Sequence, residues 1–473
     1  MTRRDGLPLD VSRQALLEHT SEIILQAWQS FDQARPGEPP IDDGLKALAG
    51  ASLFESPTSA QQALAEAARV LDSSLAQSRP RFFAFVGSSG LEVGVLADAL
   101  ASCFDVNLAV SGKSADLIEA QALRWVGEFI GYPANGGAFT SGGMVSNLTA
   151  LAAAREHALP RSRHEGLAGK HVALYCSSEA HYSVKRAAEI LGIGADNVRG
   201  LPIDKTRRVN SKDVARAVDL DRKSGITPLA VIATTGTTLT GAVDKIAELA
   251  EVCEQENVWL HVDGAYGLPA ASLNECKELF TGLERADSVT IDAHKWLYLP
   301  KACGVVLVKN RTTLAAAFSH FENYMLHDES QMNPVDMTLE YSRPFRALKL
   351  WLAFRVHGAE QFRTAIKNNL AQAKLCKELV EASEELELLV EPQLSTVPFR
   401  HVPKHLQGNE VALNDHNLKL VKRMQEDGRV YVSSAVIDGR VCLRPCFVNF
   451  RTCDDDVKVL IEVTLELGSK SPP

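Results

Sequence analysis

Three residues in this chain could carry out chemistry, and they follow two apolar, strand-like runs. The segment VWLHVDGAYG ends such a run at Asp263, and SVTIDAHKW places His294 and Lys295 just after a second run. A lysine amine can form a Schiff base, and a carboxylate can keep a pyridine nitrogen protonated so that the ring accepts electrons. A lone lysine is usually a solvated surface cation, but Lys295 lies in an apolar segment and has a partner aspartate. The two segments therefore indicate a pyridoxal phosphate site.

Three further segments offer groups that such a site needs. In FTSGGMVSN a Gly-Gly turn leads into an Ala-rich helix, so the N–H groups of Gly143 and Met144 could bind a phosphate at the positive end of the helix dipole. His181 follows a strand-like run and can stack on a flat ring. Thr238 lies in the Thr/Gly cluster after LAVIATT, where a hydroxyl can face a cofactor. Taken singly, the Gly-Gly segment could be a plain turn, His181 a core histidine, and the Thr/Gly cluster an ordinary turn at the end of a strand. They indicate a binding site because all three occur in the same chain.

The elements that carry these residues must bring them into one place. Between Pro80 and Pro344, apolar runs (HVALYCS, LAVIATT, VWLHVD, SVTID and CGVVLVK) alternate with helical patterns. This alternation indicates an α/β fold with a mostly parallel sheet that is covered by helices on both faces. Ligands bind outside the carboxyl ends of such strands, and the segments above all fall at those ends. We therefore expect one cleft to collect them.

The chain divides into three predicted parts. Residues 1–79 form helices separated by a linker that contains Pro and Gly, and residues 80–344 form the large α/β domain. Residues 345–473 begin with the long helix FRALKLWLAFRVHG and continue as a smaller α+β domain. A chain of 473 residues is too long for a single small core, which agrees with this division.

The composition is typical of a soluble enzyme and argues against several other classes. Hydrophobic residues make up 45% and charged residues 23%, and the net charge of −9 gives no indication of nucleic-acid binding. We recognise no signal peptide, and no stretch approaches the roughly 20 apolar residues of a membrane span. The nine cysteines are scattered without a Cys-x-x-Cys pair, so we expect neither a disulfide framework nor a metal site. A cytoplasmic protein fits these features best.

The motifs, taken in order, resemble those of a known family. The segments PRFFAF, TSGGMVSN, SSEAHYSVKRAAEILG, ATTGTT, HVDGAYG, DAHKW and FRALKLWLAFRVHG are similar to those of the group II pyridoxal-phosphate-dependent decarboxylases, which include glutamate and DOPA decarboxylases. The resemblance extends from about Pro80 to the C-terminus. It implies the aspartate-aminotransferase-like fold (fold type I) with a sheet of the seven-stranded type. It also implies a homodimer with active sites at the interface, in which the N-terminal helices pack on the partner subunit.

The resemblance also implies roles for individual residues. Lys295 would carry the cofactor, Asp263 would face the pyridine nitrogen, and His181 would stack on the ring. The residues that would surround the rest of the cofactor are Gly143 and Met144 at the phosphate, and Thr238, Ala265 and His294 along its length.

Two more residues would act on the substrate. Tyr324, in the segment SHFENYMLHDES, resembles a tyrosine that donates a proton across the dimer interface. Arg444, with Asn449 at the matching interval, resembles the arginine that holds the substrate α-carboxylate.

The sequence departs from the family pattern at two places. Asp292 stands where DOPA-decarboxylase-like members carry Asn, and since a carboxylate would repel a phosphate, we assign Asp292 no phosphate-binding role. Asp105 and Asn107 fall where decarboxylases of aromatic amino acids place apolar and aromatic side chains. Their polarity favours a small or polar substrate, because burying a polar group without a partner is unfavourable. The alternative is that both residues only cap or turn the chain.

We therefore predict a carboxy-lyase that converts an L-amino acid with a small or polar side chain to its amine and CO2. An oxidative aldehyde synthase is one alternative, although such relatives tend to have Phe where this chain has Tyr324. Decarboxylation of an aromatic amino acid is a second alternative. An aminotransferase, a carbon–carbon lyase or a catalytically silent binding protein agrees less well with the set of motifs.

Overall fold

The computed structural model describes residues 7, 9–32, 41–109, 112–167, 169–320 and 333–470. Its main sheet has seven strands, in the spatial order β1-β7-β6-β5-β4-β2-β3. These strands are β1 (Gly137–Thr140), β2 (Val172–Ser177), β3 (Val198–Leu201), β4 (Thr227–Thr234), β5 (Trp259–Asp263), β6 (Ser288–Asp292) and β7 (Gly304–Val308). The pairs β2–β3, β2–β4, β4–β5 and β5–β6 are parallel, whereas β7 runs antiparallel to β6 and β1. The predicted mostly parallel sheet is therefore confirmed.

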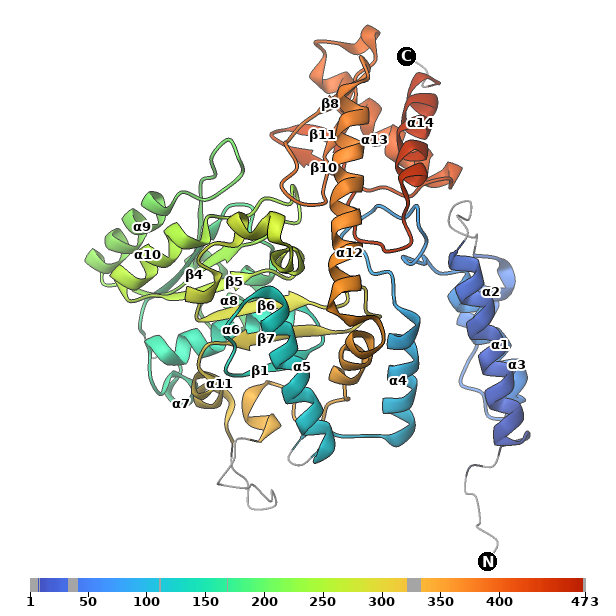
Figure 1. The fold of residues 1–473 in the computed structure, drawn as a ribbon, viewed down its shortest axis with the longest axis horizontal. Helices are drawn as coiled ribbons and strands as arrows, with labels where there is room; N and C mark the ends of the chain where they lie inside the picture. The colour runs from blue at the N-terminus through green and yellow to red at the C-terminus, as the bar shows by residue number, and fades with distance from the viewer. Residues whose placement is uncertain are drawn as a thin grey trace, which may run out of the picture.

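The described part of the chain has fourteen α-helices and a second, smaller sheet. Most of the helices pack around the two sheets, while α1, α2 and α3 stand to one side (Figure 1). The helices are α1 (Arg13–Phe31), α2 (Asp43–Ala49), α3 (Ala60–Asp72), α4 (Glu92–Phe104), α5 (Ser114–Ile130), α6 (Gly143–Ala158), α7 (Ser162–Glu165), α8 (Ser183–Ile190), α9 (Ser211–Lys223), α10 (Ile246–Glu256), α11 (Arg311–Phe318), α12 (Ala347–Glu381), α13 (Glu410–Asp427) and α14 (Asp454–Ser469). The small sheet is antiparallel, in the order β10-β11-β9-β8. Its strands are β8 (Leu386–Leu388), β9 (Phe399–His401), β10 (Ser434–Ile437) and β11 (Arg440–Leu443).

The central strands are buried along nearly their whole length and mostly apolar because helices cover both faces of the main sheet. In β4, Val231 and Ala233 belong to a core shared with α5, α9, α10 and α12, whereas Ala230 and Ile232 belong to a core shared with α6, α8 and α11. Successive side chains of a strand point to opposite faces, so a strand buried on both sides needs apolar residues at nearly every position. This requirement explains why the runs in the sequence are continuous rather than alternating.

The long helix α12 connects the two sheets (Figure 1). It bends at Gly358, whose φ of 69° is not helical. Residues before this bend, such as Leu350, pack in the core of the main sheet, whereas Cys376 and Val380 pack in the core of the small sheet. The predicted boundary between residues 344 and 345 lies just before this helix, and the division into three domains stays a prediction.

The N-terminal helices α1, α2 and α3 stand beside the main body (Figure 1). Neither α1 nor α3 has a buried residue in this single chain. Exposed apolar side chains on them include Leu17, Leu25 and Leu71. In the described residues, none of the helices is both long enough and apolar enough to cross a membrane.

Two histidines share a hydrogen bond inside the small C-terminal layer. His401 Nδ1, on β9, lies 2.8 Å from His416 Nε2, on α13, and both side chains are buried. Gly468 of α14 closes over this pair, since a methyl group there would lie 2.6 Å from the ring of His401. Burial, and to a lesser degree the positive charge of nearby Arg423, lowers the pKa of His401 to about 4. Burial followed by the charge of His401 lowers the pKa of His416 to about 4.

This pair predicts that acid destabilises the fold. Both folded-state pKa values of about 4 lie below the ordinary value of about 6.5, so the unfolded chain binds more protons between these two limits. The free energy of unfolding should therefore fall as the pH drops through this window, by up to about 1.4 kcal/mol per pH unit for each proton. We expect His416→Gln to flatten the dependence of the unfolding midpoint on pH between about pH 6.5 and pH 4.

Denaturant titrations followed by tryptophan fluorescence would measure the effect, with the exposed His171→Gln as the matched control. Equal slopes for His416→Gln and for the parent protein would show that the pair does not sense pH.

Candidate active site

The carboxyl ends of the central strands open onto one cavity. Its lining comes from residues at or after the ends of β1, β2, β4, β5 and β6, as the strand order requires. The lining residues are Gly143, Met144, Asn147, His181, Ser183, Thr234, Gly236, Thr238, Asp263, Ala265, Tyr266, Asp292 and Lys295. Seven of the predicted cofactor residues are therefore brought together, while His294 lies next to Lys295 without lining this cavity.

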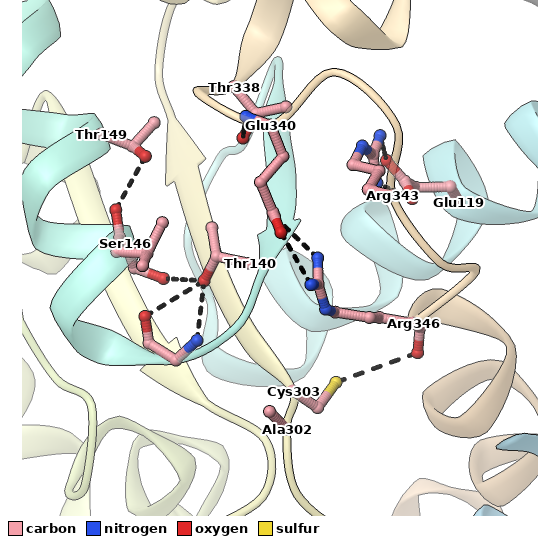
Figure 2. Close-up of polar contacts among 12 residues, drawn as sticks. Glu119, Thr140, Ser146, Thr149, Ala302, Cys303, Thr338, Glu340, Arg343 and Arg346 are labelled. Carbon is pink, nitrogen blue, oxygen red and sulfur yellow. Dashed lines mark hydrogen bonds and ion pairs between the residues drawn. The ribbon is translucent and has the colours of Figure 1, made fainter. Parts of the chain in front are cut away.

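The turn between β1 and α6 can bind an anion. Thr140 Oγ1 accepts the N–H of Gly142 at 3.2 Å and lies 2.7 Å from Ser146 Oγ, which holds the turn against the first turn of α6 (Figure 2). Gly142 has a φ of 151°, and a methyl group at Gly143 would lie 3.0 Å from Asp292 Oδ2. The first N–H groups of a helix have no partner within the helix, so they can bind a phosphate here.

The carboxylate of Asp292 faces Lys295. Lys295 Nζ lies 3.0 Å from Asp292 Oδ2, and the Asp292 side chain is only 4% exposed. His294 Nε2 lies 3.8 Å from the same oxygen, and His294 Nδ1 lies 3.0 Å from the carbonyl oxygen of Cys303. Burial lowers the pKa of His294, although the charge of Asp292 opposes this shift. Within the described residues, Asp292 Oδ1 has no hydrogen-bond partner.

Asp263 and His181 lie in the same hydrogen-bonded group of side chains. Asp263, at the end of β5, accepts hydrogen bonds from Asn147 Nδ2 at 2.9 Å and from the backbone N–H of Ala265 at 3.2 Å. His181 Nδ1 lies 2.9 Å from Ser183 Oγ at the start of α8. Burial lowers the pKa of His181, and the negative charge of Asp263 partly offsets this effect.

Arg444 reaches the edge of this region from the small sheet. Its Nη1 donates to the carbonyl oxygen of Phe85 at 2.9 Å, and its Nε donates to that of Leu239 at 3.3 Å, next to Thr238. Its Nη2 is buried and has no partner in the described part of the chain. Asn449 instead ties two segments together, since its Nδ2 donates to the carbonyl oxygen of Arg79 at 2.8 Å.

Asp105 and Asn107 do not join Lys295 within one chain. They line a separate cavity of about 750 Å³ that shares no lining residue with the first. Asp105 caps the C-terminal end of α4 with a φ of 48°, which agrees in part with the capping alternative. Asn107 Nδ2 donates to Ser342 Oγ at 3.3 Å, and Asn107 Oδ1 accepts the N–H of Arg343 at 3.2 Å.

Two ion pairs hold the wall of this second cavity (Figure 2). Arg343 Nη1 donates to Glu119 Oε2 at 2.7 Å, and Arg346 makes two bonds of 2.7 and 2.8 Å to the Glu340 carboxylate. The proposed proton donor, Tyr324, lies outside the described residues.

Sequence reasoning missed Asn147, Ser183 and His261. A signal for two of them was available, because Asn147 follows Gly143 by one helical turn and His261 shares the face of Asp263 on β5. Their side chains act through hydrogen bonds between segments that are far apart in sequence, which a pattern along the chain does not show.

These groups fit pyridoxal phosphate. The helix N-terminus can bind the phosphate, Asp263 can face the pyridine nitrogen, and Lys295 can bond to the aldehyde carbon. Gly142 and Gly143 place no side chain between the helix N-terminus and Asp292, and Asp292 Oδ1 has no hydrogen-bond partner among the described residues. No group of three or more His, Cys, Asp or Glu side chains that could hold a metal ion occurs in the described ranges.

Comparison with known proteins agrees with this geometry. The model of the "Pyridoxal-dependent decarboxylase conserved domain" matches residues 43–402. An aromatic-L-amino-acid decarboxylase of Bacillus atrophaeus is 35% identical over 80% of this chain and 79% of its own length. An aspartate 1-decarboxylase of Aliivibrio fischeri is 33% identical over 63% of this chain and 58% of its own length.

Solved structures show the same fold. Oryza sativa TDC with PLP and tryptamine superposes with a TM-score of 0.92 at 25% identity, over 98% of this chain and 99% of that chain. Mouse CSAD in its apo form superposes with a TM-score of 0.91 at 26% identity, over 97% and 99% of the two chains. The predicted fold class and cofactor are confirmed. The chain therefore belongs to the pyridoxal-dependent decarboxylase family, as an enzyme of fold type I that uses pyridoxal phosphate to remove the carboxyl group of an amino acid.

Proposed function

We propose that this enzyme decarboxylates an L-amino acid with a small or polar side chain and that it works as a homodimer. The observation that carries the proposal is the shared cavity in which the Lys295 amine, the Asp263 carboxylate and the N-terminus of α6 meet. The polarity of Asp105 and Asn107 supports the substrate class.

The proposed roles of the cofactor-binding residues follow from their chemistry. Bound pyridoxal phosphate supplies an electron sink that withdraws electrons from the substrate Cα when CO2 leaves. Lys295 would hold the aldehyde carbon, Asp263 would keep the pyridine nitrogen protonated, and His181 would cover the ring. Gly143 and Met144 would offer backbone N–H groups to the phosphate, Thr238 and Ala265 would form part of the remaining wall, and His294 would support the site from beside Lys295.

The substrate-binding residues have a separate task. Arg444 would hold the substrate α-carboxylate with Nη2, whose lack of a protein partner supports this role. The bond from Cα to the carboxyl carbon breaks, CO2 departs, and Cα receives a proton. Tyr324 would supply that proton, and retaining a tyrosine there favours the amine over an aldehyde product.

Two observations support the homodimer. Helices α1 and α3 bury no residue in the single chain and expose Leu17, Leu25 and Leu71. Asp105 and Asn107 lie on a cavity apart from Lys295, so they can act on substrate only if that cavity faces the site of a partner subunit. Residues 1–79 would then form the arm that packs on the partner, and residues 80–344 and 345–473 the two domains that enclose the cofactor.

Decarboxylation of an aromatic amino acid is the second candidate. It is favoured by the relative at 35% identity, which is named an aromatic-L-amino-acid decarboxylase. The relative at 33% identity is named an aspartate 1-decarboxylase, so the family names alone leave both substrate classes open.

A panel of amino acids would test the proposed function. We expect aspartate, glutamate, cysteine sulfinate or diaminobutyrate to yield amine and CO2 faster than DOPA, tyrosine or tryptophan. Asn107→Phe should shift the preference toward the aromatic substrates, because it replaces an amide with an apolar ring. Lys295→Ala is the control and should lose both turnover and the reducible link to the coenzyme. Faster turnover of DOPA than of every polar substrate would contradict the proposed substrate class.

Replacement of Tyr324 by Phe should change the product. The ring keeps its bulk but loses its proton, so amine formation should fall by about a hundredfold or more. Cα would then stay unprotonated for longer and could react with oxygen, so aldehyde and ammonia should rise. Chromatography of amine and aldehyde from one reaction measures the ratio. Amine formation at the parental rate without aldehyde would exclude the role of Tyr324.

Replacement of Asp292 by Asn should strengthen coenzyme binding. The carboxylate lies against Gly143, where the phosphate is expected, and like charges repel. Asn keeps the shape and can still contact Lys295, so we expect the Kd for pyridoxal phosphate to fall by about fivefold, or about 1 kcal/mol. Fluorescence titration of coenzyme-free protein gives the Kd, with the exposed Asp438→Asn as the control. Weaker binding would mean that the attraction between Asp292 and Lys295 dominates.

A further inference from the structure

A buried series of hydrogen bonds lies behind the carboxylate of Asp263. The indole N–H of Trp259 donates to Ser288 Oγ at 2.8 Å, and Ser288 Oγ lies 2.8 Å from His261 Nδ1. His261 Nε2 lies 3.0 Å from Asn147 Oδ1, and Asn147 Nδ2 donates to Asp263 Oδ2 at 2.9 Å. None of these five residues is more than 5% exposed.

The chemistry of each group sets the direction of this series. A carboxylate can only accept, so Asn147 presents Nδ2 to Asp263 and Oδ1 to His261. An amide oxygen can also only accept, so His261 Nε2 carries a proton. Burial lowers the pKa of His261 to about 4, so the ring is neutral, and its unprotonated Nδ1 accepts the hydrogen of the Ser288 hydroxyl. The indole N–H of Trp259 donates to the same hydroxyl. Every donor in the series therefore points toward the carboxylate.

The amide of Asn147 also begins a second series of hydrogen bonds, which leads through Ser183 to His181. The same Nδ2 donates to Ser183 Oγ at 2.8 Å. Because Ser183 Oγ accepts this bond, its own hydrogen is free for His181 Nδ1, which lies 2.9 Å away. The backbone N–H of Ser183 also donates to His181 Nδ1, at 3.3 Å. Two donors on Nδ1 require that neutral His181 carries its proton on Nε2.

We propose that Asn147 is a positioning residue whose single amide group orients Asp263 and, through the Ser183 hydroxyl, stabilises the tautomer of His181 that the backbone N–H of Ser183 also favours. The inference rests on the proposed function, in which both residues contact the coenzyme. Donors to a carboxylate favour its charged form, which suits a protonated pyridine nitrogen. A His181 with its proton on Nε2 offers an N–H and no lone pair at that edge, and this donor suits the anionic carboxylate of an amino-acid substrate.

Nitrogen NMR of the full-length protein labelled with [15N]histidine tests the tautomer, with His181→Gln to assign the signals. In the parent protein we expect His181 Nδ1 to resonate as an unprotonated nitrogen and Nε2 as an N–H. Asn147→Asp keeps the shape but accepts the hydrogen of Ser183, so only the backbone N–H of Ser183 still donates to His181 Nδ1, and the two shifts of His181 should move toward each other as a mixture of tautomers forms. Asn147→Leu removes both amide N–H groups and should move the shifts in the same direction by a smaller amount.

The Kd for pyridoxal phosphate tests the hydrogen bond from Asn147 to Asp263. Asn147→Leu should raise the Kd for pyridoxal phosphate by about tenfold or more, because the carboxylate loses a charge-assisted hydrogen bond. Thr149→Val is the matched control on the same helix, since Thr149 is buried and its hydroxyl bonds only the carbonyl oxygen of Val145, at 2.7 Å. It should leave both the His181 shifts and the Kd unchanged.

Unchanged His181 shifts in Asn147→Asp and Asn147→Leu would overturn the inference, as would equal effects of Thr149→Val. If neither Asn147 variant folds, Ser183→Ala carries the test, and parental His181 shifts in that variant overturn the inference. The shifts are read without turnover. If the amino-acid panel contradicts the proposed function, the NMR result on the tautomer of His181 therefore remains valid.

Discussion

Burial of the Asp263 carboxylate at the end of a central strand is the constraint on which the rest of the site depends. A buried charge costs several kcal/mol unless hydrogen bonds or an opposite charge compensate it. Here the compensation comes from the N–H of Ala265 and from Asn147 on α6, the helix that packs across β5. Helix α6 therefore has two tasks, since its N-terminus offers N–H groups to an anion and its first turns carry the amide that supports Asp263.

A second pair of opposite charges, Lys295 and Asp292, lies in the same site. Lys295 Nζ and the Asp292 carboxylate lie 3.0 Å apart, where the Asp292 side chain is 4% exposed and the Lys295 side chain is 23% exposed. The two glycines at residues 142 and 143 let this carboxylate approach the helix N-terminus, where family members with Asn at the same position would present a neutral amide. Asp292 thus places a carboxylate beside the turn where the phosphate is expected, and this is the basis of the proposal that Asp292 weakens coenzyme binding.

In the proposed function, substrate choice would depend on a different part of the molecule. The cavity that Asp105 and Asn107 line is built from α4, the segment before α12, and the ion pairs Arg343–Glu119 and Arg346–Glu340. Residues that set specificity on such a wall can change without disturbing Asp263 or Lys295. This separation offers a physical reason why relatives with similar folds carry names that refer to tryptamine, aromatic amino acids or aspartate.

The sequence by itself determined the sheet and the chemistry at its edge. Strands β2, β4, β5, β6 and β7 coincide with continuous apolar runs, because a strand buried on both faces admits few polar residues, and Asp263 and Lys295 stand at strand ends that must converge. Only the tertiary structure decided which side chains bond to one another. The amide of Asn147 meets His261, Asp263 and Ser183 across long stretches of chain. It also separated Asn107 from Lys295 and turned Asp292 toward the lysine. A hydrogen bond requires that packed elements hold the donor and the acceptor at the right distance to within a few tenths of an ångström. No periodicity along a chain encodes that precision.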